Sequence, residues 1–175
     1  MNNIKGFIES SIGNWNSMRS SHSLAFQHFE QVLSKVRIEK LSKDCDEVID
    51  LVESFSCKSI QIKDPFKVSW ESESDWDENE KSADYSIFVP IEKSEENGII
   101  LRSTGYSESI RVISRYQFLA DGTFKLNSNY SETNSEERIL FISDNVRYRT
   151  SVIKGNSNNS IIQTSFATEI RKISD

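Results

Sequence analysis

The residues best suited to chemistry lie late in the chain, in two neighbouring segments. Glu137 stands in the first segment, and the second carries Arg147, Arg149 and Ser151 at alternating positions. Because side chains two residues apart point to the same face of a strand, the last three share a face. Guanidinium groups bind carboxylates as bidentate forks, and a carboxylate accepts hydrogen bonds from N–H groups. Together these groups suit a ligand that carries both carboxylates and N–H groups.

The turn between the two segments decides whether Glu137 faces the arginines. A three-residue loop over residues 143–145, with Asn145 in the left-handed region, would pair Ile142 with Val146 and place all four side chains on one face. A two-residue loop would place the arginines on the opposite face from Glu137. On an inward face these charges would need partners or water, because an unpaired buried charge is costly.

The pattern leaves a plainer alternative open for these charged residues. Arg147 and Arg149 can instead point outward, as ordinary cross-strand charges on a solvated face. Glu169 shares a face with Ser165 and Ala167 near the end of the chain, and its default interpretation is a solvated strand residue.

Other kinds of reactive site have little support in the sequence. His22 and His28 lie near the start of the chain and no Gly-x-Ser-x-Gly motif occurs, so a nucleophilic triad is not expected. The two cysteines, Cys45 and Cys57, form no zinc-ligand spacing with the histidines, so we expect no metal site. The six glycines are scattered singly and provide no phosphate-binding loop.

Two helices are predicted near the start of the chain. Hydrophobic residues recur at helical spacing over residues 3–11 and 44–55. The second segment opens with Asp44 followed by Glu47, a spacing that resembles a capping box.

Nearly all of the remaining chain is predicted to form strands. Short runs of β-branched and aromatic residues, separated by turn residues, give candidate strands at 15–26, 35–41, 59–71, 85–91, 99–103, 110–119, 123–130, 138–142, 147–153 and 161–173. Hairpin turns are predicted at Asn97-Gly98, Asp121-Gly122 and Gly155-Asn156. Because no helix separates the later strands, the sheet is expected to be antiparallel, and closure into an up-and-down barrel would remove its edges. The expected fold is mainly β: one domain over residues 1–175, with a barrel of about ten strands and two helices.

Length and composition exclude several classes of protein. The 175 residues suit one domain. No apolar run approaches the ~18 residues that a membrane span needs. The net charge of −6, from 21 basic and 27 acidic residues, has the wrong sign for neutralising a phosphate backbone, so neither nucleic acid nor a membrane is an expected partner. The first residues show no signal or transit peptide, which predicts a cytoplasmic protein.

An acidic segment surrounds one of the tryptophans. Residues 71–80 hold six acids around Trp76, a composition typical of a solvated loop. A large aromatic side chain in such a loop has two interpretations: it folds back as a plug, or it contacts a ligand.

Several segments of the chain resemble a known family. Gly13-Asn14-Trp15 resembles the opening motif of lipocalins, in which the tryptophan closes one barrel end, often against an arginine from the last strand. Arg171 is the candidate for that arginine. Together with this motif, five segments resemble the S-type phycobiliprotein lyases, the CpcS/CpeS family: residues 15–26, the Trp76-Asp77 pair, and residues 136–141, 147–152 and 165–171. The similarity extends over essentially the whole chain.

The resemblance implies a lipocalin-like barrel that binds an open-chain tetrapyrrole, a bilin, without covalent attachment. Such a lyase delivers the bilin to the central cysteine of a phycobiliprotein subunit, where a thioether joins the thiol to the A-ring ethylidene group. The bilin is the substrate, so no cofactor is expected. Phycoerythrobilin is favoured over phycocyanobilin, and a phycoerythrin subunit over other acceptors, while a homodimer stays open. The abundance of Asn, Ile, Lys and Ser is compatible with a cyanobacterial or phage-infected cyanobacterial cell.

Carried over position by position, the resemblance predicts eight bilin-contacting residues: Arg19, Trp70, Trp76, Glu137, Arg147, Arg149, Ser151 and Glu169. The implied catalytic residues are Glu137, Arg147 and Glu169. In this hypothesis the arginines hold the propionates or a ring carbonyl, the glutamates bind or protonate pyrrole nitrogens, and the tryptophans stack on the rings. Leu140 and Tyr148 depart from the usual residue types of the family and are expected to change the shape of the pocket.

Two other functions stay open at this level. One is a lipocalin-like carrier that binds a bilin or another small molecule without transferring it, since the nucleophile belongs to the acceptor. The other is an interaction module, in which the acidic first half of the chain docks a basic partner; residues 1–100 hold 11 basic and 19 acidic residues. A bilin titration distinguishes the carrier, which binds the pigment, from the interaction module, which does not. Transfer of the bilin to an acceptor subunit distinguishes a lyase from a carrier.

Overall fold

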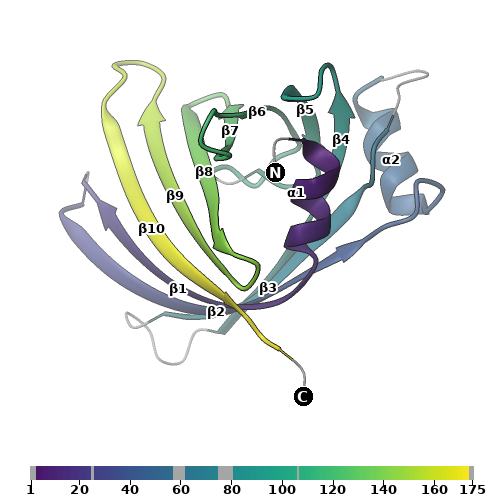
Figure 1. Cartoon of the computed structure of the whole chain (residues 1–175). Helices are drawn as coiled ribbons and strands as arrows, with labels where there is room; N and C mark the ends of the chain where they lie inside the picture. The colour runs from purple at the N-terminus through teal and green to yellow at the C-terminus, as the bar shows by residue number, and fades with distance from the viewer. Residues whose placement is uncertain (1–2, 25, 57–61, 75–80, 106, 174–175) are drawn as a thin grey trace.

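The structure is a computed structural model that describes residues 3–24, 26–56, 62–74, 81–105 and 107–173. Its elements are α1 (Ile4–Ser11), β1 (Gly13–Ser23), β2 (His28–Lys40), α2 (Asp46–Ser54), β3 (Phe66–Ser74), β4 (Lys81–Glu92), β5 (Asn97–Arg102), β6 (Val112–Phe118), β7 (Phe124–Asn129), β8 (Thr133–Ser143), β9 (Val146–Gly155) and β10 (Ile161–Arg171). The strands form one closed antiparallel barrel in the order β1-β10-β9-β8-β7-β6-β5-β4-β3-β2, so β1 pairs with both β2 and β10 (Figure 1). The expected mainly β barrel with two helices is therefore confirmed.

Alternation along the strands separates the inside of the barrel from its outside. In β6, residues from Val112 to Phe118 alternate strictly between buried and exposed. The alternation in β2 already begins at His28, which makes this strand longer than the predicted 35–41. The third strand begins at Phe66, later than predicted, and residues 57–61 lie outside the described chain.

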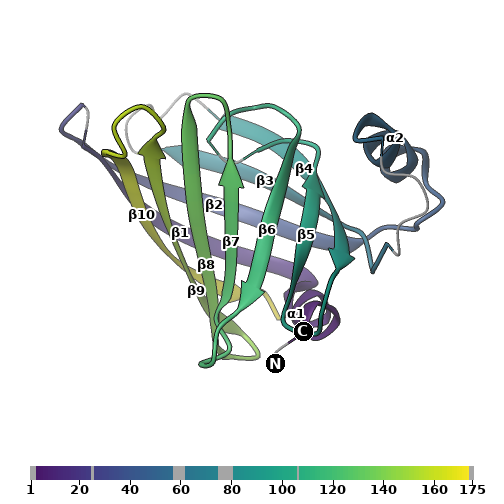
Figure 2. The same cartoon turned by 90° about the horizontal axis from the view of Figure 1, so that it is seen from above.

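α1 closes one end of the barrel. Its buried side chains include Phe7 and Ile8, and the Phe7 ring stacks on Phe124 with ring centroids 4.0 Å apart. Asn3 caps the helix by accepting the Gly6 N–H at 2.8 Å. Figure 2 shows α1 at this end of the barrel and α2 outside the barrel wall. The aromatic core therefore fills the α1 end, and the interior beyond it is available for a site.

The contact expected between Trp15 and Arg171 is present at the same end. The Arg171 guanidinium lies over the Trp15 ring, 4.3 Å from its centroid. It also donates hydrogen bonds to the carbonyl oxygens of Ser10 and Ile12. Trp15 donates its indole N–H to the carbonyl oxygen of Ser11 at 2.8 Å. The last strand thus fixes the chain between α1 and β1 to the barrel.

α2 packs on the outside of the wall formed by β4 and β5. Val48 and Leu51 are buried against outward side chains of these strands, among them Val89 and Leu101. This helix shields an apolar part of the outer wall from water. No helix in the described ranges is long and apolar enough to cross a membrane.

The predicted capping box of this helix is wrong. Cys45 is the N-cap residue, and no side chain caps the helix. The N–H of Asp44 binds the Ser42 hydroxyl at 3.3 Å, because Asp44 lies in the preceding turn rather than at the cap. Asp46 and Glu47 occupy the first turn, where negative charge is favoured by the helix dipole.

Two of the three predicted hairpin turns are confirmed. Asp121-Gly122 joins β6 to β7; Gly122 has a φ of 84°, and Asp121 Oδ1 accepts the Thr123 N–H at 2.9 Å. Gly155 ends β9, and its carbonyl oxygen accepts the Asn159 N–H at 2.9 Å across the turn to β10.

The third predicted turn, Asn97-Gly98, is wrong because both residues belong to β5. The chain turns earlier, where the N–H groups of Lys93 and Ser94 both donate to the Asn97 carbonyl oxygen at 3.0 Å. Gly98 is required by close packing within the sheet: a Cβ there would lie 2.3 Å from the Ile91 carbonyl oxygen.

Candidate functional site

A cavity of about 460 Å³ lies inside the barrel. Phe7 and Phe124 line it toward α1, and Phe88 of β4 contributes a further ring. Its ionisable lining residues are Arg19, Glu30, Arg102, Glu137, Arg147, Arg149 and Glu169. Among the described lining residues these four arginines and three glutamates give one excess positive charge, in a protein whose net charge is −6.

The hairpin of β8 and β9 brings its charged residues to the cavity. Glu137 pairs with Ser151 and Ile139 pairs with Arg149, so the inward faces of the two strands meet. Arg147 lies one step further along the same face of β9. The predicted shared face is confirmed, and the alternative with both arginines outside is wrong.

The turn that produces this register differs from the predicted one. Ser143 pairs with Val146 across a two-residue turn, and Asn145 does not have a positive φ. A two-residue turn alone would have put the arginines outside. However, the register shifts between Phe141 and Ser143, where Ile142 is the extra residue of a β-bulge. The bulge therefore brings Arg147 and Arg149 to the same face as Glu137, as a three-residue loop would have done.

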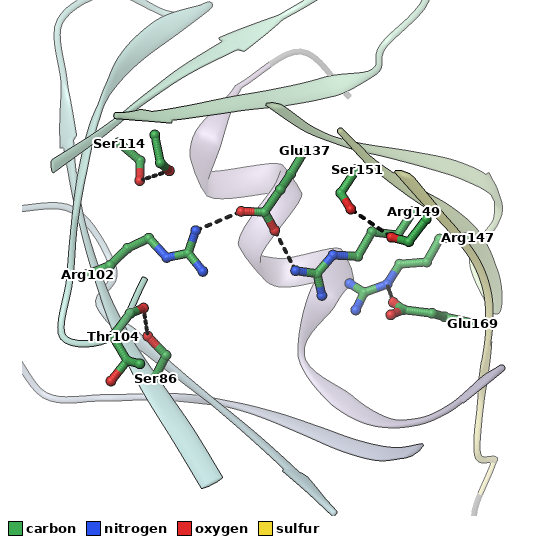
Figure 3. A network of polar contacts seen from close by, with 11 residues as sticks. Ser86, Arg102, Thr104, Ser114, Glu137, Arg147, Arg149, Ser151 and Glu169 are labelled. Carbon is green, nitrogen blue, oxygen red and sulfur yellow. Dashed lines mark hydrogen bonds and ion pairs between the residues drawn. The ribbon is translucent and has the colours of Figure 1, made fainter. Parts of the chain in front are cut away.

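Glu137 lies between two arginines inside the barrel (Figure 3). Its Oε1 accepts a hydrogen bond from Nη1 of Arg102 at 2.7 Å, and its Oε2 accepts one from Nη2 of Arg149 at 2.5 Å. Glu137 and Arg102 are each 3% exposed. Burial by itself raises the pKa of the Glu137 carboxyl, but the charges of both arginines outweigh it and hold the pKa below its ordinary value. Glu137 is therefore a carboxylate at neutral pH.

A second ion pair joins Arg147 to Glu169. These residues are directly opposite each other on β9 and β10, and Nε of Arg147 lies 2.5 Å from Oε2 of Glu169. Glu169 is 2% exposed, so its interpretation as a solvated residue is wrong. The Arg147 guanidinium also lies 4.4 Å from the centroid of the Trp15 ring. Burial lowers the pKa of Arg147, and the Glu169 carboxylate opposes this shift.

Ser151 lies on the inward face of β9, beside Glu137 on β8 and Ser165 on β10. Its hydroxyl and that of Ser165 are 2.7 Å apart, and Ser165 is the one that lines the cavity. Ser151 is buried, so the structure places it where it can orient Ser165.

Arg19 and Trp70 line the cavity from β1 and β3. Arg19 is half-buried, and its Nε has no hydrogen-bond partner among the described residues. Trp76 lies outside the described residues, as do both interpretations of its loop. Of the eight residues taken from the family resemblance, the cavity thus brings six together.

Arg102 is a cavity residue that the sequence analysis missed. It follows Ile100 by two positions on β5, so an arginine on the inward face of an apolar strand was visible in the sequence. Its partner Glu137 is on β8, and only closure of the barrel brings these strands to face each other across the interior. The sequence spacing alone could not reveal this pair.

Leu140 and Tyr148 do not line the cavity, so the expectation that they change the pocket shape is wrong. They pair with each other on β8 and β9, at positions that alternate with the inward residues. The Tyr148 ring is exposed on the outer wall, 5.4 Å from that of Phe166.

Within the described ranges, no three His, Cys, Asp or Glu side chains gather in a way that could hold a metal ion. The polar part of the cavity therefore consists of arginine, glutamate and hydroxyl groups. Such groups bind anions and N–H donors.

Comparison with known proteins gives consistent matches. The profile of the family described as CpeS-like protein matches residues 3–172. "Chromophore lyase CpcS/CpeS 3" of Trichodesmium erythraeum is 42% identical over 170 residues, which cover 96% of this chain and 98% of that protein. "Putative phycoerythrobilin lyase CpeS" of Microchaete diplosiphon is 40% identical over 146 residues, which cover 83% of this chain and 66% of that protein.

A solved structure matches as well. The S-type phycobiliprotein lyase CPES from Guillardia theta superimposes with a TM-score of 0.87 and 32% sequence identity, over 99% of this chain and 94% of that one. Because sequence and fold agree over nearly the whole length, this chain belongs to the CpeS-like family.

Proposed function

We propose that this protein is a lyase that binds a bilin non-covalently inside its barrel and delivers it to a cysteine of a phycobiliprotein subunit. The observation that carries the proposal is the buried arginine–glutamate network that faces a cavity of about 460 Å³. Small-molecule sites have volumes of roughly 300–1,000 Å³. Buried charges are costly to desolvate, so their concentration around a cavity favours a binding role. The names of the relatives, chromophore lyase and phycobiliprotein lyase, support bilin attachment as the reaction.

The propionates and pyrrole rings of a bilin match the arginines and aromatic side chains of the cavity. A bilin carries two propionates, which arginine forks bind through charge-assisted hydrogen bonds. Arg147 and Arg149 share one inward face, and in this proposal they hold propionates or a ring carbonyl. Trp70 and the phenylalanine rings of the lining provide surfaces on which the pyrrole rings stack.

Glu137 serves this reaction as a hydrogen-bond acceptor. A general acid needs a raised pKa, whereas the pKa of Glu137 is lowered by Arg102 and Arg149. As a carboxylate it accepts pyrrole N–H groups and holds the bilin in one conformation. The contribution to the rate is then orientation of the A ring toward the incoming thiol. Glu169 lines the cavity from β10, and in this proposal it accepts a further N–H group.

The nucleophile of the reaction comes from the acceptor. No cysteine of the described chain lines the cavity, and Cys45 lies at the start of α2, outside the barrel wall. The acceptor thiol adds across the A-ring ethylidene double bond, so one C–S and one C–H bond form and there is no leaving group. The lyase keeps the bilin unattached until the acceptor supplies its sulfur.

Phycoerythrobilin is the substrate that we favour. Support comes from the 40% identical relative whose name specifies this bilin. A phycoerythrin subunit is the corresponding acceptor, and phycocyanobilin is the alternative substrate.

A transfer assay tests the proposal. The protein is mixed in dim light with phycoerythrobilin or phycocyanobilin and an apo-phycoerythrin subunit, and covalent product is measured by denaturing gel fluorescence. We expect faster and more uniform attachment than in the spontaneous reaction, and none to a subunit whose central cysteine is replaced by serine. Binding of bilin without faster attachment would identify a carrier instead.

Arg147→Gln tests, in the same assay, whether Arg147 and Arg149 hold the bilin as a clamp. Loss of one charge-assisted fork is expected to slow transfer by about 10- to 100-fold. Arg115→Gln is the matched control, because Arg115 is exposed on the outside of β6, and it should transfer at the wild-type rate. Full transfer by the Arg147 variant would contradict the clamp.

A further inference from the structure

We propose that Arg102 is an additional carboxylate-binding residue of the cavity, which takes one bilin propionate on the side of Glu137 opposite Arg149. The inference rests on the proposed bilin-binding function. It assigns a role to a residue that lies outside the set expected from the family resemblance.

The first observation is an incompletely satisfied buried guanidinium. Arg102 is 3% exposed and uses Nη1 to bind Glu137, but its Nε is buried without a hydrogen-bond partner among the described residues. An unpaired buried donor is costly, and in native proteins it commonly indicates a missing ligand or water. The Nε–Nη2 edge of a guanidinium is the edge that a carboxylate binds in bidentate form.

The second observation is that the Arg102 guanidinium is held in place. The Phe88 ring lies 4.8 Å from its central carbon, which fixes the plane of the group. Beyond the strand end, the hydroxyl of Ser86 donates to the Thr104 carbonyl oxygen at 2.9 Å and fixes the chain that follows Arg102. Figure 3 shows Ser86 and Thr104 next to Arg102, on the far side of Glu137 from Arg149. A guanidinium group that is already held in place loses little conformational entropy when a ligand binds.

The third observation is the spacing between two cationic groups. Arg102 and Arg149 bind the two oxygens of one carboxylate at 2.7 and 2.5 Å. These distances limit the separation of the two bound nitrogens to about 7 Å. A bilin carries its two propionates on adjacent inner rings, so two neighbouring cations suit this dianion. The described lining holds one arginine more than glutamates, and this single net positive charge offsets one of the two propionate charges.

Binding then becomes an exchange of carboxylates. A propionate that binds Arg102 weakens the hydrogen bond between Arg102 and Glu137. The Glu137 carboxylate oxygens can then accept hydrogen bonds from pyrrole N–H groups. Propionate recognition and N–H recognition are thereby coupled through one side chain. No covalent bond is made or broken in this step; hydrogen bonds are exchanged between carboxylates and N–H groups.

Titrations with phycoerythrobilin and its dimethyl ester test this role. The ester removes both negative charges and leaves the conjugated rings unchanged. For Arg102→Gln we expect the affinity for the diacid to fall by about 10- to 100-fold, while the affinity for the ester changes little. Arg115→Gln, on the outer face of β6, should bind both forms as the wild type does. Circular dichroism of each variant establishes that it is folded.

The outcomes separate this inference from the proposed function. If wild-type protein binds neither form, the bilin-binding function itself fails. If wild-type protein binds the diacid but Arg102→Gln weakens diacid and ester equally, or weakens neither, Arg102 does not bind a propionate.

A measurement on wild-type protein covers the case in which Arg102→Gln does not fold. The ¹⁵N–¹H resonance of the Arg102 Nε group, assigned through its side-chain carbons, is followed during titration. We expect the diacid to shift it downfield, as a new charge-assisted hydrogen bond does, and the ester to leave it in place. A resonance that the bound diacid leaves unmoved would overturn the role.

Discussion

Glu136 and Glu137 are adjacent on β8 and each is paired with two basic residues, yet they face opposite sides of the barrel wall. Glu136 binds Lys125 and Arg138 on the outside, where its side chain is 32% exposed. The side chain of Glu137 is 4% exposed and binds two arginines inside. Exposed ion pairs contribute little to stability, whereas removal of one partner from a buried set leaves uncompensated charge. The two neighbours therefore form a natural matched pair for mutation.

We predict that Glu137→Gln lowers the free energy of unfolding at pH 7 by about 3 kcal/mol, because the buried Arg102 and the half-buried Arg149 lose their shared counter-ion. Glu136→Gln is the control and should cost less than about 1 kcal/mol. Urea unfolding followed by circular dichroism measures both. Equal effects of the two substitutions would show that Arg102 and Arg149 do not depend on Glu137 as their counter-ion.

The stability difference between wild type and Glu137→Gln should depend on pH. The pKa of Glu137 is lowered below its ordinary value of 4.5, so its contribution to stability is fully present above that pH. It is lost as the pH falls through the lowered folded-state pKa. The stability difference between wild type and Glu137→Gln should therefore shrink below about pH 4.5. A difference that stays constant from pH 7 down to pH 3 would mean that this carboxyl titrates normally.

At the scale of the element, Gly98 shows how close packing can require a residue that resembles a turn signal. A Cβ at Gly98 would lie 2.3 Å from the Ile91 carbonyl oxygen and 2.6 Å from the Tyr116 ring. Neither a sheet backbone nor a buried ring can move away easily.

We predict that Gly98→Ala lowers the free energy of unfolding by about 2 kcal/mol or more, through overpacking between β4, β5 and β6. Gly155→Ala is the control, because the nearest atom to its added methyl group is the Asn158 side-chain oxygen at 3.3 Å. It should change stability by less than about 1 kcal/mol. Thermal melts of both variants measure the difference, and a neutral Gly98→Ala would contradict the packing account.

Elements whose signal is local were predicted well. The stripe that contains Phe7 and Ile8 predicted α1, and the number and order of the strands follow from alternation and turn residues, although β2 and β3 begin at other residues than predicted. Predictions failed where tertiary packing decides: Asn97-Gly98 has the composition of a turn, but the chain turns at 93–96 instead. The helix that begins after Cys45 was placed correctly, with the wrong cap.

The inward face of Arg147 and Arg149 was predicted for an incomplete reason. The Ile142 bulge decides which face of the sheet Arg147 and Arg149 occupy. Nothing in the local sequence distinguishes a bulge followed by a two-residue turn from a three-residue loop without a bulge. The residue pattern alone predicts a solvated Glu169, because its ion pair with Arg147 depends on the register of β10, whereas the family resemblance predicts Glu169 in the site. Strand positions are therefore easier to predict than the direction of their side chains.

At the scale of the whole molecule, barrel closure creates the site. Arg102 and Glu137 are 35 positions apart in the chain and meet only because the sheet curves around a common interior. This explains why Arg102 was missed, although the barrel itself was expected from the number of strands.

The two ends of the barrel differ in a way that suits delivery. Aromatic packing around Phe7 and Phe124 fills the α1 end. The lining residues Thr104 and Gly105 lie beyond the end of β5, toward the opposite end. If the cavity binds a bilin as proposed, the ligand and the acceptor thiol would reach it from the end away from α1.

The central claim is that this cavity binds a bilin, and a visible absorption and fluorescence titration of the purified protein tests it most directly. Phycoerythrobilin and phycocyanobilin are titrated separately in dim light. The account predicts a red-shifted, sharpened band that saturates near one bilin per chain, because the network and the rings fix one pigment conformation. The absence of any spectral change with either pigment would contradict it.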